Sequence, residues 1–255
     1  MAINKDDITN KNEIEWQNLA GLETKTLTNK PNHIAFILDG NRRWAKKNGL
    51  SPNKGHKKGA ENIENLCNWC MKYEIKFLTL YCLSIENLNR SKNELKYLFT
   101  SIKTFLTSRR IEEYNNRGIN ISVIGDFSVL PQDVRQTLEK INQRSIEKPK
   151  LFLQLCIGYS GRNEIVNAVK KAIQINAKAD EINEKTFEKL LFTSNIPDVD
   201  FLIRTGGDMR ISNFLLCKIS YAELYFCKQF FPEFNEKNFL LALYDFQDRM
   251  RRYGR

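Results

Sequence analysis

The chain has 255 residues, of which 42% are hydrophobic and 27% charged, and these are ordinary values for a globular protein. The formal net charge of +10 predicts anionic partners, and nucleic acid, an acidic membrane surface and phosphorylated small molecules all fit that charge. No stretch approaches the roughly 20 apolar residues that a membrane-spanning helix needs, which argues against an integral membrane protein.

Six cysteines lie at irregular spacing and no apolar leader precedes them, so we expect reduced thiols in a cytoplasmic protein. Cys67 and Cys70 form a CxxC pair, a pattern that redox and zinc sites also show. Residues 59–73 have the pattern of a helix, and the pair falls within it. Because there is no second pair and no nearby histidine, two core residues on one face of that helix are the more usual interpretation.

The chain divides into an arm and a domain. Residues 1–30 are rich in Lys, Asn, Thr and acidic residues, which predicts a partly mobile N-terminal arm. Residues 31–255 contain no repeat, low-complexity linker or second domain, so we expect one folded domain there.

A buried strand is predicted at residues 33–38, and Asp39-Gly40-Asn41 ends it with residues suited to a tight turn. Asp39 is therefore expected at the carboxyl end of a strand, where open α/β sheets bind ligands. Seven basic residues and no acidic one lie between Asp39 and Glu61, which suits a diphosphate. A capping Asp beside a solvated charged face would give the same pattern.

A second strand is predicted at residues 76–83, with a polar loop at residues 84–90 on the same edge as Asp39. Ser91 to Glu94 is a capping box that opens a long helix with an apolar stripe from Leu95 to Leu106. That stripe fits the wall of a core and the wall of a ligand tunnel equally well.

Further strands at residues 119–124, 151–157 and 201–204 alternate with helices that begin near Pro131 and Arg162. This alternation predicts a single α/β domain with a mostly parallel central sheet flanked by helices.

A second chemical centre follows Arg204, where two glycines allow close backbone approach and Arg210 and Ser212 add donors. The P-loop and dinucleotide-binding glycine patterns are both missing. Glu223 lies in an apolar strand pattern, where a carboxylate is costly to bury unless it is paired or metal-bound.

Five segments, taken in order, resemble the cis-prenyltransferases, of which bacterial undecaprenyl diphosphate synthase is the best-known member. They are residues 39–47, 84–90, 158–162, 204–214 and 221–226. The resemblance runs from about Pro31 to the last residue. The DDxxD pattern of the unrelated all-helical trans-prenyltransferases is missing, so that class is set aside.

The resemblance implies a transferase that condenses isopentenyl diphosphate onto an allylic diphosphate, with farnesyl diphosphate as the expected primer. Its product would be a long polyprenyl diphosphate with cis double bonds, such as undecaprenyl diphosphate. The implied fold has a hydrophobic tunnel between two helices, and Leu151 matches the residue at the tunnel floor that sets chain length.

The resemblance also implies a set of site residues. Asp39 and Glu223 would coordinate Mg²⁺, and Asp39, Asn41 and Asn87 would be catalytic. The proton-removing group is left open, with a phosphate oxygen of the substrate as one candidate. The residues assigned to the substrates are Gly40, Asn41, Arg42, Arg43, Trp44, Lys54, His56, Ser84, Glu86, Asn87, Arg90, Arg204, Arg210, Ser212, Arg252 and Gly254.

Family members also suggest partners. A homodimer is expected, in which Arg252 and Gly254 of one subunit complete the site of the other, and the lipid product would bring the protein to the inner face of the membrane. Nucleic acid is not expected, because the chain carries no recognition motif for it. A non-catalytic partner subunit is disfavoured, since the Asp39 turn and the Arg204 segment are both present. Four departures from the family pattern are Pro52, Leu88, Asp208 and Cys217.

Overall fold

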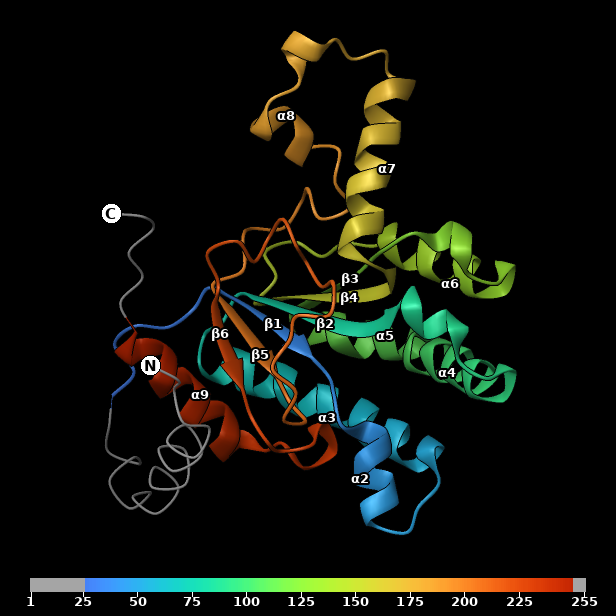
Figure 1. The fold of residues 1–255 in the computed structure, drawn as a ribbon. Coiled ribbons are helices and arrows are strands. Elements are labelled where there is room, and N and C mark those ends of the chain that lie inside the picture. Colours follow the sequence, from blue (N-terminus) through green and yellow to red (C-terminus); the bar gives the residue numbers. More distant parts are fainter. Residues whose placement is uncertain (1–25, 250–255) are drawn as a thin grey trace, which may run out of the picture.

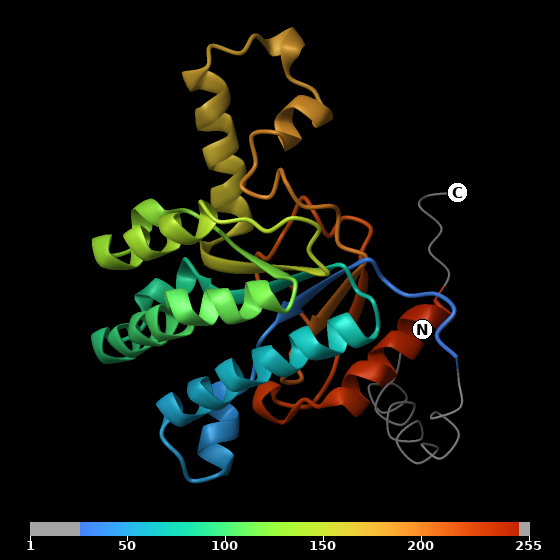
Figure 2. The same ribbon diagram turned by 180° about the vertical axis from the view of Figure 1, so that it is seen from behind.

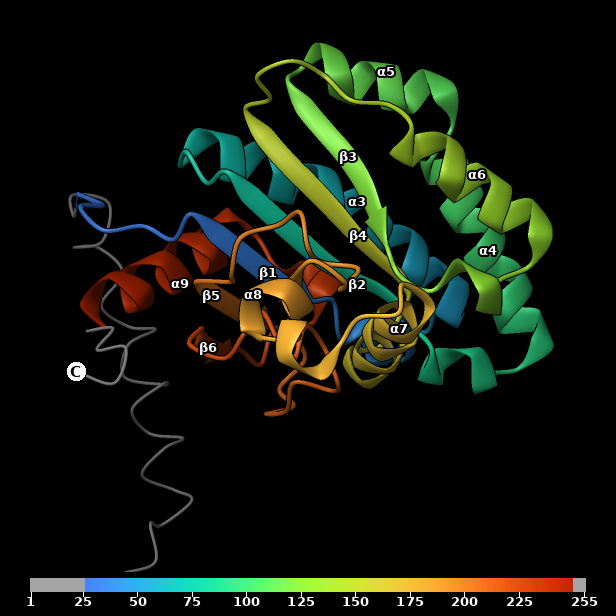
Figure 3. The ribbon, with the colours of Figure 1, turned by 90° about the horizontal axis from the view of Figure 1, so that it is seen from above.

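Parallel strands form the centre of the molecule, in the order β3-β4-β2-β1-β5-β6 (Figures 1 and 3). The computed structural model describes residues 26–249, and all neighbouring strands of this sheet pair in parallel. The predicted parallel α/β architecture is confirmed. The strands are β1 (His33–Ile37), β2 (Phe77–Ser84), β3 (Ile119–Ile124), β4 (Leu151–Tyr159), β5 (Phe201–Arg204) and β6 (Glu223–Phe226).

Helices connect most of these strands and pack mainly on one face of the sheet (Figures 1 and 2). The α-helices are α2 (Asn41–Lys47), α3 (Pro52–Lys72), α4 (Lys92–Phe105), α5 (Ser108–Asn116), α6 (Gln132–Asn142), α7 (Gly161–Gln174), α8 (Glu184–Glu188) and α9 (Glu236–Asp248). Short 3₁₀ turns are η2 (Glu86–Asn89), η3 (Phe127–Val129), η4 (Ala179–Glu181) and η5 (Phe231–Glu233). None of the described helices is both long and apolar enough to cross a bilayer.

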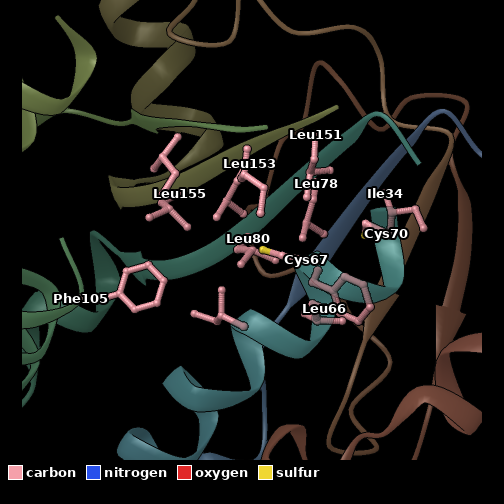
Figure 4. Packing of buried hydrophobic residues seen from close by; sticks show 14 of the residues in the cluster. Ile34, Leu66, Cys67, Cys70, Leu78, Leu80, Phe105, Leu151, Leu153 and Leu155 are labelled. Atoms are coloured by element: carbon pink, nitrogen blue, oxygen red, sulfur yellow. The ribbon is translucent and has the colours of Figure 1, made fainter. Parts of the chain in front are cut away.

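The larger apolar core lies between the sheet and a layer made of α3, α4, α5, α6 and α9. Figure 4 shows Leu151, Leu153 and Leu155 of β4 in a row beside α3. Cys67 and Cys70 of α3 are free, fully buried thiols in this core, which confirms their interpretation as core residues. A smaller core on the other face is covered by the segment between α8 and β6, while α7 and α8 project outward (Figure 1).

Two helix boundaries differ from the prediction. The helix expected from Gly59 begins at Pro52, because a proline suits the first turn and Ser51 has the extended conformation of an N-cap residue. The long helix expected through Leu106 ends at Phe105, and the Thr107 side chain accepts a hydrogen bond that starts α5. Lys54 and His56 therefore lie in the first turns of α3.

The parallel register gathers the predicted turns at one edge. Ile37 of β1 lies opposite Tyr81 of β2 and Arg204 of β5, and Ser84 lies opposite Tyr159 of β4. The segments that follow these strands therefore meet at the carboxyl edge of the sheet, where α/β proteins bind ligands.

Candidate active site

A cavity of about 1690 Å³ lies at the carboxyl edge of the sheet, and its lining has two parts. The polar part is formed by the segments that follow β1, β2 and β5. The apolar part lies between α3, α4 and the sheet and includes Ile63, Leu98, Ile102, Phe105 and Leu155. The predicted hydrophobic tunnel is therefore present, and α4 lines it. Such a lining suits a ligand with a charged head and an apolar tail.

The turn after β1 is shaped by glycines. Gly40 has φ +102°, and a Cβ there would lie 2.6 Å from the side chain of Phe230. A Cβ at Gly59 of α3 would lie 2.3 Å from Asn41 Oδ1, so α3 packs directly on the turn. The Asn41 amide donates to Leu38 O at 3.1 Å, and its buried Oδ1 has no hydrogen-bond partner in the described residues.

Asp39 is held between two arginines. Its Oδ1 lies 3.0 Å from Arg43 Nη2, and its Oδ2 accepts from Arg204 Nη2 at 2.8 Å. Its backbone N–H donates to Thr205 Oγ1 at 3.0 Å. Partial burial acts to raise the pKa of Asp39, but the hydrogen bonds from Arg204 and Arg43 outweigh it and hold the pKa below its usual value. The carboxylate is therefore ionised at neutral pH.

Arg204 is a buried guanidinium with a dense set of partners. Its Nη1 donates to Ser212 Oγ at 2.7 Å and also to the backbone oxygen of Arg210. Its Nε has no hydrogen-bond partner within residues 26–249. The structure thus brings together Arg204, Arg210 and Ser212, which the family resemblance assigns to substrate binding.

Asp208 joins this group, although the sequence marked it only as a departure from the family pattern. Its Oδ2 lies 3.2 Å from Arg43 Nη2, 3.0 Å from Arg210 Nη2 and 3.6 Å from Arg204 Nη2. We call Asp39, Asp208 and these three arginines the Asp39 cluster. Three guanidinium groups against two carboxylates leave the cluster with an excess positive charge for an anion.

A second ionic group surrounds Glu94, in the first turn of α4. Its Oε1 lies 3.0 Å from Arg90 Nη1 and 3.6 Å from His56 Nε2, and its Oε2 lies 3.8 Å from Arg42 Nη1. We call these four residues the Glu94 cluster. The sequence pattern predicts Glu94 only as part of a capping box, and the spacing of four residues between Arg90 and Glu94 was the available signal for an ion pair.

The loop after β2 closes another side of the cavity. The Asn87 N–H donates to Ser84 Oγ at 3.1 Å, and Asn213 Nδ2 donates to Glu86 Oε1 at 2.9 Å. Ser84, Glu86, Asn87 and Arg90 all line the cavity, on the same edge of the sheet as Asp39.

Several predicted residues lie elsewhere. Trp44 and Lys54 are not part of the cavity lining, and Lys54 is exposed on α3. Leu151 is fully buried but lies four residues before Leu155, about 13 Å along β4 at roughly 3.3 Å per residue, and does not line the cavity. Arg252 and Gly254 fall outside the described residues.

Glu223 is separated from Asp39 within the chain. Glu223 pairs in register with Phe201, three residues before Arg204, so it lies at the amino end of its strand, about 10 Å further along at roughly 3.3 Å per residue. Its Oε2 lies 3.1 Å from Arg249 Nη1. The structure therefore does not bring the two expected metal ligands together in one chain, and an ion pair accounts for the half-buried Glu223.

Comparison with known proteins gives consistent matches. A family profile described as putative undecaprenyl diphosphate synthase matches residues 37–254. A tritrans,polycis-undecaprenyl-diphosphate synthase (geranylgeranyl-diphosphate specific) of Thermoplasma acidophilum is 42% identical over 234 residues, covering 89% of this chain and 90% of that protein. An isoprenyl transferase of Aquifex pyrophilus is 42% identical over 225 residues, covering 88% and 96%.

A solved structure also superimposes well. It is lavandulyl diphosphate synthase from Lavandula x intermedia in complex with dimethylallyl diphosphate, with a TM-score of 0.83 and 35% sequence identity. The match covers 89% of this chain and 99% of that one.

Proposed function

Because this chain belongs to the undecaprenyl diphosphate synthase family, we propose that it condenses isopentenyl diphosphate units onto an allylic diphosphate and releases a long polyprenyl diphosphate such as undecaprenyl diphosphate. The observation that carries the proposal is the cavity, which sets two basic clusters beside an apolar space of a size suited to a prenyl tail. The chain is a transferase, as its family and relatives are.

The identity of the allylic primer can be proposed from the relatives. The resemblance suggested farnesyl diphosphate, whereas the Thermoplasma acidophilum relative is named as specific for geranylgeranyl diphosphate. At 42% identity over most of both chains, that relative favours the longer primer. We therefore propose geranylgeranyl diphosphate as the preferred primer of this chain.

Each substrate has a proposed set of donors. The turn after Asp39, with Arg43 and His56, would hold the allylic diphosphate, and Arg204, Arg210 and Ser212 would hold isopentenyl diphosphate. The double bond of isopentenyl diphosphate attacks the allylic carbon, the bond from that carbon to the diphosphate oxygen breaks, and a proton is lost. Guanidinium groups held in place beforehand stabilise the charge on the departing diphosphate without reorganising.

Magnesium fits the donor set at Asp39. Mg²⁺ prefers oxygen ligands and usually binds one or two carboxylates together with substrate phosphates, and Asp39 is an ionised carboxylate in the cavity lining. No group of three or more His, Cys, Asp or Glu that could hold a metal occurs in residues 26–249, so substrate oxygens would supply the remaining ligands. When bound, the ion would help to neutralise the leaving diphosphate.

A homodimer would explain how Glu223 could serve as a metal ligand although it lies away from Asp39 in its own chain. Since Glu223 does not reach Asp39 in one chain, its proposed metal role requires that a second copy supply it. The exposed side chains of Val166, Val169 and Ile173 follow helical spacing on the projecting α7, which supports a protein contact there. A long lipid product would also bring the protein to a membrane surface.

The proposal is tested by incubating the pure protein with labelled isopentenyl diphosphate, Mg²⁺ and either geranylgeranyl or farnesyl diphosphate. We expect long products with cis double bonds and a higher kcat/KM with geranylgeranyl diphosphate. A preference for farnesyl diphosphate would overturn the primer proposal alone, and no condensation with either primer would overturn the proposed function.

A further inference from the structure

Glu94 lies behind the polar lining of the cavity and contacts three basic side chains from three separate segments. Arg42 comes from α2, His56 from α3, and Arg90 from the segment after η2. These three side chains line the cavity, whereas Glu94 does not. Its side chain is only 15% exposed.

We propose that Glu94 is a positioning residue, which holds Arg42, His56 and Arg90 as one set of donors for the allylic diphosphate. This inference rests on the proposed function, since it takes the cavity to bind a diphosphate. Two guanidinium groups that share one carboxylate repel each other, and Glu94 between them allows both to converge beside His56, whose lowered pKa leaves it mainly neutral at pH 7. Without Glu94, the two arginines are expected to turn toward solvent.

Glu94 also connects these donors to the tunnel. Its N–H donates to Ser91 Oγ at 3.4 Å in the first turn of α4, where the helix dipole favours a carboxylate. Leu98, one turn further along the same helix, lines the apolar part of the cavity. One residue therefore links the group that would hold the diphosphate to the wall that would hold the tail.

Charge alone predicts the opposite effect from positioning. A carboxylate near a bound diphosphate repels it, so a bystander Glu94 would weaken anion binding and its neutralisation would strengthen binding. If Glu94 instead holds the donors in place, its neutralisation weakens binding, because the donors disperse. The sign of the change in affinity separates the two cases.

The first test is calorimetric binding of inorganic pyrophosphate with Mg²⁺ to wild-type protein and to Glu94→Gln, which keeps the shape of the side chain. We expect binding weakened about tenfold, the loss expected from one poorly placed charged hydrogen bond. Glu113→Gln is the matched control, because Glu113 forms a similar pair with Arg109, four residues before it, at 3.0 Å on α5 and loses the same charge. The control should bind as wild type does.

The second test uses the two histidines of the chain, His33 and His56, whose imidazole signals can be followed by NMR. Burial lowers the pKa of His56, Arg90 and Arg42 lower it further, and Glu94 raises it. If Arg42 and Arg90 keep their places in Glu94→Gln, the titration midpoint of His56 must fall, because only the raising effect of Glu94 is lost. If the two arginines disperse, as the positioning role requires, their lowering effect is lost as well and the midpoint stays close to its wild-type value. The midpoint of His33 should stay unchanged in either case, which reports that the fold is intact.

The outcomes separate the two proposals. Equal or tighter pyrophosphate binding by Glu94→Gln, or a His56 midpoint that falls as it should with both arginines still in place, would overturn the positioning role while the proposed function stands. A wild-type protein that binds no pyrophosphate would overturn the proposed function, and this inference with it.

Discussion

The two ends of β1 carry different polar chemistry. At the amino end, His33 is fully buried, with Nδ1 2.9 Å from Pro197 O and Nε2 2.8 Å from Thr79 Oγ1. Because a carbonyl can only accept, Nδ1 carries the proton and Nε2 accepts from the Thr79 hydroxyl. At the carboxyl end, Asp39 is charged, lies between two arginines and faces the cavity.

This difference shows how one strand serves both stability and function. The neutral group at the amino end has both ring nitrogens partnered, so it contributes to the fold and offers nothing to a ligand. The charged group at the carboxyl end belongs to a cluster with more cations than anions. Changes at the two ends should therefore separate stability from activity.

The largest effect on activity is expected at the carboxyl end. Asp39→Asn should lower kcat by roughly 10²–10³-fold, the usual cost of losing one preorganised electrostatic group. The protein should still fold, since asparagine has nearly the same shape, and circular dichroism checks this. Turnover within a few fold of wild type in steady-state assays would contradict the role of Asp39 as metal ligand.

The largest effect on stability is expected at the amino edge of the sheet. Leu151→Ala removes a fully buried side chain and should cost about 2–5 kcal/mol in the free energy of unfolding. The family resemblance places Leu151 at the tunnel floor, whereas the cavity reaches only Leu155 of the row that Figure 4 shows; if the resemblance holds for this residue, the variant should also give longer products.

The control for this variant is Leu138→Ala in the buried face of α6. It should lose comparable stability in urea unfolding and give wild-type products. An unchanged product distribution in Leu151→Ala would show that the tail ends before that residue.

Lowering the pH should decrease the free energy of unfolding through His33, at the amino end of β1. Burial lowers the pKa of His33 from 6.5 to about 4, so the unfolded chain takes up this proton first as the pH falls. The contribution of neutral His33 to the free energy of unfolding is complete above pH 6.5 and is lost between pH 6.5 and 4, to a total of about 3 kcal/mol. Urea unfolding across this range measures the loss. His33→Gln, which does not titrate, should show a shallower dependence on pH, and an equal slope would refute the assignment.

A smaller effect is expected from Gly206→Ala. Gly206 has φ +89°, and an added Cβ would lie 2.8 Å from Arg43 Nη2, so the arginine must move away from Asp39. We expect kcat/KM to fall about tenfold, or about 1.4 kcal/mol. Gly207→Ala carries similar backbone strain at φ +83°, but its Cβ would meet nothing closer than 3.9 Å. Equal losses in the two variants would assign the effect to the backbone alone.

Much of the fold could be predicted from the sequence, because strands buried on both faces are continuous apolar runs. Because alternating strands and helices predict parallel strands, the residues that follow each strand could also be placed at one edge of the sheet. The early start of α3 was missed because its first turns are basic and polar, although Pro52 is a recognised signal for a helix start.

The ionic clusters were harder to predict. Local rules give Glu94 a sufficient role as a capping residue, and its contacts with Arg42 and His56 depend on how α2, α3 and α4 pack. The place of Glu223 depends on the register between β5 and β6, which a single strand pattern does not contain. In both cases long-range packing decides the partner.

The placement of the cysteines has a practical consequence for labelling. The pKa values of all six thiols are raised, with burial as the largest cause, to about 12 for Cys67, Cys82 and Cys227. The thiolate is the form that reacts with maleimides and peroxide, so little of it exists at neutral pH. A cysteine introduced on the exposed face of α6 should therefore take up a fluorophore selectively in the otherwise native chain, and the enzyme should tolerate oxidants without added reductant.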